Sequence, residues 1–90
     1  MGKMNRDDVL TILRRDNPTA RADEIVMYAD CFVDYREAAK NISENGNVVA
    51  HPRTGSPIEN PYIKVKASAM NQLRKLARIK KVATLWDYTE

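Results

Sequence analysis

Apolar residues recur at helical spacing along most of this chain. In residues 20–44 they follow steps of three and four for about seven turns, which is the clearest periodic signal in the sequence. The apolar positions are Ile25, Tyr28, Ala29, Phe32, Tyr35, Ala39 and Ile42. This pattern predicts a long amphipathic helix. Thr19 is its predicted N-cap, and Gly46 marks its predicted end, because glycine suits the left-handed position after a helix.

A shorter helix is predicted over residues 6–15. Its apolar stripe consists of Val9, Ile12 and Leu13. Asn5 is the predicted N-cap, and the acidic residues Asp7 and Asp8 fall in the first turn, where the helix dipole favours negative charge. Turn-forming residues at positions 16–19 predict the end of this helix.

A third helix is predicted over residues 60–83, followed by a tail at 84–90. Asn60 and Pro61 predict its start as N-cap and first helical residue, since proline loses no hydrogen bond there, and Tyr62 is the predicted packing anchor. The apolar arc comprises Ala69, Met70, Leu73, Leu76 and Ala77. The opposite arc is basic and comprises Arg74, Lys75, Arg78 and Lys81.

The connector between the two long helices, residues 45–59, is predicted to be stiff. The stretch 46–66 holds three of the four prolines and two of the three glycines. Each proline fixes its own φ and moves the preceding residue away from helical dihedrals. Residues 47–50 and 56–59 can pair as a short β-hairpin across the turn from Pro52 to Gly55, and an irregular loop is an equal alternative.

These elements predict an all-α fold in a single domain, residues 1–90. The expected architecture is a long antiparallel helical hairpin with a short N-terminal helix, and with at most a short β-hairpin in the connector. Only 7% of the residues are aromatic, so the expected core is aliphatic and thin. Because self-association is a common remedy for a thin core, we expect a homo-oligomer.

Charge is distributed unevenly between the two halves of the chain. Residues 1–45 carry seven basic and nine acidic residues, whereas residues 60–86 carry seven basic residues and no acidic one. Such asymmetry favours either a polyanionic partner or self-assembly through opposite faces.

The sequence offers no constellation typical of an enzyme or of a metal site. Cys31 and His51 are each the only residue of their type, so no cysteine–histidine cluster and no intrachain disulfide is expected. There is no phosphate-binding glycine motif and no apolar run long enough to span a membrane. We therefore expect a cytoplasmic protein that is not an enzyme and that carries no cofactor and no metal.

The predicted nucleic-acid surface is the basic side of the third helix. Arg74, Arg78 and Lys81 align at i, i+4 and i+7, and each can neutralise a phosphate. The full candidate set is Arg53, Lys64, Lys66, Arg74, Lys75, Arg78 and Lys81. The alternatives are a solvated face, or a face that docks on the acidic second helix of a neighbouring subunit.

Residues 6–36 also fit a helix-turn-helix loosely, which would indicate a transcriptional regulator. Asp23 and Glu24 at the start of the would-be recognition helix argue against it, because they repel phosphate. A protein-binding helical adaptor without nucleic-acid contact is the remaining alternative.

The connector carries motifs of a known family. The relevant residues are Gly46-Asn47-Val48-Val49, then Pro52-Arg53-Thr54-Gly55, and then Asn60-Pro61-Tyr62 at the start of the next helix. With the long helix that precedes them, these motifs make residues 24–80 resemble the small subunit of tailed-phage terminases. The resemblance implies structural roles for Pro52, Gly55, Asn60, Pro61 and Tyr62.

The resemblance further implies a non-enzymatic component of a viral DNA-packaging machine. Such proteins assemble into rings, recognise double-stranded phage DNA and hand it to the large subunit, which holds the ATPase and the nuclease. A phage- or prophage-encoded protein in the cytoplasm of a bacterial host is therefore expected.

Overall fold

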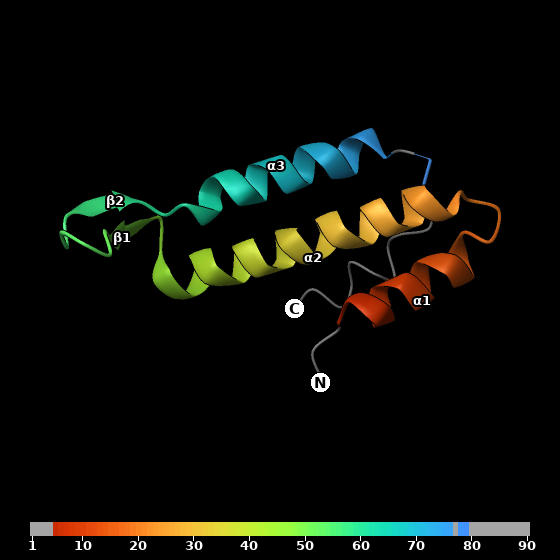
Figure 1. Ribbon diagram of the computed structural model, residues 1–90, viewed down its shortest axis with the longest axis horizontal. Helices are drawn as coiled ribbons and strands as arrows, with labels where there is room; N and C mark the ends of the chain where they lie inside the picture. Colours follow the sequence, from red (N-terminus) through yellow and green to blue (C-terminus); the bar gives the residue numbers. More distant parts are fainter. Residues whose placement is uncertain (1–4, 77, 80–90) are drawn as a thin grey trace.

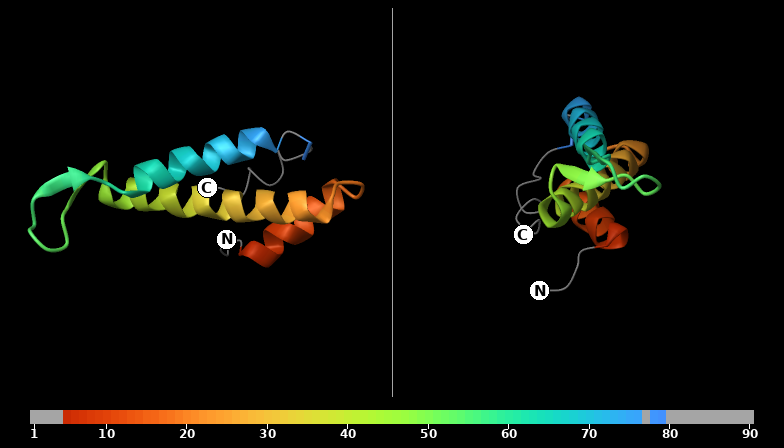
Figure 2. Two further views of the ribbon diagram at one scale, coloured as in Figure 1. Left: turned by 45° about the horizontal axis from the view of Figure 1, so that its top comes forward. Right: turned by 90° about the vertical axis from the view of Figure 1, so that its left-hand side faces the viewer.

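The computed structural model describes residues 5–76, 78 and 79, and in these residues three helices and one small sheet succeed one another (Figure 1). The elements are α1 (Arg6–Asp16), α2 (Ala22–Asn45), β1 (Val48–Ala50), β2 (Pro57–Glu59) and α3 (Tyr62–Lys75). The long helix α2 lies between α1 and α3, and α3 runs antiparallel to α2 (Figure 2). The predicted mainly helical fold with a short hairpin is confirmed, and within the connector a β-hairpin forms in place of an irregular loop.

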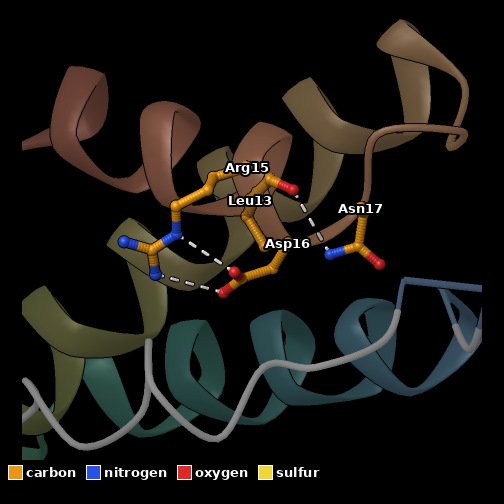
Figure 3. A network of polar contacts seen from close by, with 4 residues as sticks. All are labelled: Leu13, Arg15, Asp16 and Asn17. Atoms are coloured by element: carbon orange, nitrogen blue, oxygen red, sulfur yellow. Dashed lines mark hydrogen bonds and ion pairs between the residues drawn. The ribbon is translucent and has the colours of Figure 1, made fainter.

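Local capping determines both ends of α1. The side chain of Asn5 accepts a hydrogen bond from the Asp8 N–H at 2.9 Å, and the Asp8 carboxylate accepts one from the Asn5 N–H at 3.2 Å. This capping box confirms Asn5 as the N-cap. At the other end, the carbonyl of Leu13 accepts from the backbone and side-chain N–H groups of Asn17, at 2.8 and 3.3 Å (Figure 3). Beside this contact, Arg15 pairs with Asp16.

The core is formed where α1 and α3 pack on α2. Phe32 and Val9 have no exposed surface, and Leu13 has 1%. The other members of the cluster are Leu10, Ile25, Tyr28, Ala29, Leu73, Leu76 and Ile79. Most of them are aliphatic, so the prediction of an aliphatic core is consistent with this packing.

The start of α2 differs from the sequence-based expectation. Arg21 occupies the N-cap position with extended dihedrals and makes no side-chain capping hydrogen bond, so Thr19 is not the cap. The reason is the turn before the helix, in which the Ala20 N–H donates to the Asn17 carbonyl at 3.1 Å. This contact keeps Thr19 in the turn, two residues before the N-cap Arg21.

We call the junction of α2, the hairpin and α3, around Gly46 and Asn60, the elbow. Together with the hairpin, the elbow fixes how α2 passes into α3. Strands β1 and β2 pair antiparallel with Val49 opposite Ile58, and the hairpin extends beyond the helices at one end of the molecule (Figure 1). Gly46, at the end of α2, has φ +83° and ψ −179°, an extended conformation with positive φ that favours glycine. Behind it lies Asn60, which is 1% exposed and joins the elbow through hydrogen bonds.

Helix α3 ends earlier than predicted. Its last residue is Lys75, whereas the periodicity predicted helix to residue 83. Leu76 has non-helical dihedrals, and successive turns bring Leu76 and Ile79 into the core at 8% and 5% exposure. Burial of these two side chains therefore takes the place of the continued helix. Ala77, Lys81 and the predicted tail at 84–90 lie outside the described residues.

Candidate nucleic-acid interface

Helix α3 exposes a basic face. The helix carries four basic residues and no acidic one. Its apolar side, with Ala69 and Leu73, is buried against α2. Lys64 and Lys75 are eleven residues apart, so they return to the same side of the helix, about 16 Å apart along its axis. We call Lys64, Arg74 and Lys75, which are all exposed, the basic face of α3.

Lys66 does not belong to this face. Its Nζ lies 5.7 Å from the centre of the Tyr35 ring of α2, in a cation–π contact, and the residue is half-buried. It also lines an open groove at the elbow together with Ile42 and Val48. The structure therefore places Lys66 at the α2–α3 interface, where its charge is less available to a phosphate.

Arg78 is also displaced from its predicted position. Because α3 ends at Lys75, Arg78 lies in the following turn, and the predicted alignment of Arg74 and Arg78 on one helix is wrong, whereas Lys81 lies outside the described residues. Its guanidinium Nη1 lies 3.8 Å from the carboxylate of Glu24 on α2, while 82% of its side chain remains exposed. Arg78 thus keeps solvent access beside an acidic neighbour.

Arg53 lies at the opposite end of the molecule, in the turn of the hairpin. The N–H groups of Arg53 and Thr54 donate to His51 Nδ1 at 3.1 and 3.4 Å, so this ring nitrogen acts as an acceptor. The Gly55 N–H donates to the His51 carbonyl at 2.9 Å, and Gly55 has φ +74°. Arg53 is exposed in this turn and lies outside α3.

The remaining motif residues hold the elbow together. Pro52 lies exposed in the hairpin turn, and Pro61 has helical dihedrals at the start of α3. Asn60 Oδ1 accepts from the Tyr62 N–H at 3.0 Å, as an N-cap side chain does. Tyr62 itself is 39% exposed, so its side chain is not fully packed within the described part of the chain.

The acidic residues of α2 share one side of the helix, which the sequence-based analysis missed. Successive steps of seven, four, three and seven residues return to the same side. We call this set the acidic stripe: Asp23, Asp30, Asp34, Glu37 and Glu44, all exposed. The spacing of these acidic residues in the sequence could have predicted the acidic stripe. The prediction for this helix relied instead on the apolar periodicity of its other side.

The arrangement of α1 and α2 does not favour a helix-turn-helix. Such units cross at about 90–120°. Here α1 runs back alongside α2, and Arg6 at the start of α1 forms an ion pair with Asp30 of α2. The Asp30 carboxylate raises the pKa of Arg6, chiefly through this hydrogen bond. Asp23 and Glu24 open α2, as the sequence indicated.

Reactive side chains are sparse in the described residues. Burial raises the pKa of the Cys31 thiol, and the charges of Asp34 and Asp30 raise it further. In residues 5–76, 78 and 79, no three histidine, cysteine, aspartate or glutamate side chains are grouped as metal ligands would be. No helix in this part of the chain is long and apolar enough to cross a membrane.

Comparison with known proteins gives one match. The family model described as "Phage terminase, small subunit" matches residues 2–78, which is most of the chain and includes the whole connector. No curated protein and no solved structure matches.

Proposed function

The chain belongs to the phage terminase small subunit family, as its connector motifs predicted, and on this premise we propose that it binds double-stranded phage DNA. It acts as a non-catalytic component of the genome-packaging machine, without cofactor or metal. It recognises the phage DNA and presents it to the terminase large subunit in the bacterial host cytoplasm. A homo-oligomeric ring is the assembly that we expect to carry out this task.

The basic face of α3 is the observation that supports DNA binding most directly. Lys64 and Lys75 make no ion pair with any described residue, and α3 has no acidic residue to repel a phosphate. Each lysine that neutralises a phosphate releases condensed counterions, which favours binding at low salt. Arg74 adds a guanidinium fork beside them, suited to phosphate oxygens.

Fluorescence anisotropy with labelled duplex DNA, over a series of salt concentrations, tests this proposal. For the unmodified protein, we expect the logarithm of the binding constant to fall linearly with the logarithm of salt concentration. The double variant Lys64→Glu/Lys75→Glu should weaken binding at least tenfold and flatten this slope. Unchanged affinity in this variant would overturn the assignment of the surface.

A matched control separates the basic face from overall charge. The double variant Arg14→Glu/Lys40→Glu makes the same change in net charge at exposed positions of α1 and α2. We expect it to weaken binding much less. Absence of any salt-dependent binding in the unmodified protein would favour a protein-binding adaptor instead.

A further inference from the structure

Two exposed faces of this molecule have opposite charge and compatible spacing. Helix α2 carries six acidic and two basic residues, and α3 carries four basic and no acidic residues. The acidic stripe and the basic face both lie outside the core. We propose that the acidic stripe of α2 in one copy docks on the basic face of α3 in a second copy of this chain.

The positions of the charges along the two helices agree. Lys64 and Lys75 are eleven residues apart, and Asp23 and Asp34 are also eleven residues apart. At 1.5 Å per residue, both separations are about 16 Å. The whole acidic stripe extends about 32 Å, so both lysines of one copy reach carboxylates of the other at the same time.

Three carboxylates of the acidic stripe, Asp23, Asp30 and Glu44, pair with basic residues of the same chain, and the other two do not. Asp34 and Glu37 make no ion pair with any described residue, and the same holds for Lys64 and Lys75. The pairs that do involve the stripe, such as Arg21–Asp23 at 3.1 Å, are largely exposed and therefore weak. A second copy brings the missing countercharges.

Each face also offers an exposed apolar side chain beside its charges. Met27, four residues after Asp23 and seven before Asp34, is 49% exposed. Val65, which is 40% exposed, follows Lys64 in the sequence and lies about 100° around the helix from it, at the edge of the basic face. Exposed charge pairs alone contribute little to affinity and mainly set orientation and association rate. Covering these apolar side chains adds the favourable burial that charge pairing lacks.

The two docking faces are different surfaces, so each copy offers one face of each kind. A contact between unlike surfaces can repeat from copy to copy and close into a ring or extend further. Because the proposed function places DNA on Lys64 and Lys75, copy docking and DNA binding compete for the basic face, so a copy whose basic face is docked binds DNA there only after that contact opens. This last point rests on the proposed function, whereas docking itself does not.

Sedimentation velocity of charge-reversal variants tests the docking. At low salt, we expect the assemblies of both Asp34→Lys/Glu37→Lys and Lys64→Glu/Lys75→Glu to have a lower molar mass than those of the unmodified protein. Mixed in equal amounts, the two variants should regain association, since each supplies the face that complements the other. Regained association also shows that both variants are folded. The control Arg14→Glu/Arg15→Glu, which makes the same change in net charge at exposed positions of α1, should keep the mass of the unmodified protein.

The outcomes distinguish docking from DNA binding. The docking proposal would be overturned if either charge-reversal variant kept the molar mass of the unmodified protein. It would also be overturned if the mixture of the two variants did not associate. DNA binding is read separately by anisotropy, where Asp34→Lys/Glu37→Lys retains the basic face and should bind DNA at least as tightly. If the docking is correct and the proposed function is not, the mixture recovers mass while Lys64→Glu/Lys75→Glu leaves DNA affinity unchanged.

Discussion

The side-chain amide of Asn60 donates a hydrogen bond to Oδ1 of Asn41 at 2.9 Å and thereby joins the start of α3 to α2. The same amide donates to the Gly46 carbonyl at 2.9 Å, and the Asn60 backbone N–H donates to the Asn47 carbonyl at 2.8 Å. Asn60 is 1% exposed, so its own polar atoms depend on these contacts. One buried side chain therefore fixes the angle at which the helical hairpin closes.

Replacing Asn60 should destabilise the whole fold. Asn60→Ala removes the acceptor of the Tyr62 N–H at the start of α3 and leaves the Gly46 carbonyl without this donor. Losses of this kind cost about 2 to 3 kcal/mol of unfolding free energy. Urea unfolding followed by circular dichroism measures the change. The control Asn47→Ala, at an exposed position whose backbone carbonyl makes the contact, should change stability little, and equal effects would contradict this view of the elbow.

The thin core makes one aromatic side chain unusually important. Phe32 has no exposed surface and is among the largest fully buried side chains in the described residues. Phe32→Ala should cost about 3 to 5 kcal/mol, which can exceed the stability of so small a domain. Thermal unfolding detects this loss. Met27→Ala on the exposed side of α2 is the control, with an expected effect within about 0.5 kcal/mol.

A side chain at Gly46 is expected to destabilise the fold, and the backbone conformation alone accounts for this cost. A Cβ added there would meet nothing within 4 Å, so a clash is not the cause. The cost arises from φ +83° with ψ −179°, a region open essentially to glycine, and amounts to about 1 to 3 kcal/mol. Urea unfolding of Gly46→Ala checks the value. Stability equal to that of Ser43→Ala, an exposed site in the last turns of α2, would contradict it.

The charge of the acidic stripe should be measurable at Cys31. Burial and the negative charges of Asp34 and Asp30 raise the pKa of its thiol, so less thiolate is present at a given pH than for an ordinary cysteine. Alkylation by iodoacetamide should therefore be slow at pH 8 and rise at higher pH. Asp34→Asn removes one cause, so its alkylation profile should shift to lower pH, and an unshifted profile would count against this influence.

The hairpin turn should contribute less to DNA binding than the basic face of α3. Arg53 is a single exposed cation in the turn of the hairpin, outside α3. Arg53→Ala should weaken binding a few-fold and lower the salt slope by about one, as expected for one lost phosphate contact. Anisotropy measures both quantities. The neighbouring variant Thr54→Ala should change neither, and a loss in it equal to that in Arg53→Ala would indicate a disturbed turn.

Local signals in the sequence predicted the elements that local forces determine. The capping box at Asn5 and the long apolar periodicity of α2 act within one or two turns, so they could be recognised without the fold. The Asn60–Pro61 pair likewise placed the start of α3 within two residues.

The end of α3 could not be predicted in this way, because tertiary burial determines it. No glycine or proline stops the helix after Lys75, and a helical pattern continues in the sequence. Leu76 and Ile79 leave that pattern to enter the core beside α2, which moves Arg78 off the helix. The surroundings of Lys66 could not be predicted for a related reason, because only the fold reveals that Tyr35 lies beside it.

The central position of α2 has a consequence for how the molecule opens. Helices α1 and α3 lie on different sides of α2 (Figure 2). Helix α1 comes first in the chain, and a short turn at residues 17–21 connects it to α2. Detachment of α1 would uncover Val9, Leu13 and their partners on α2 while the elbow at Asn60 stays closed. Hydrogen exchange should accordingly detect α1 as a unit that unfolds before the helical hairpin does.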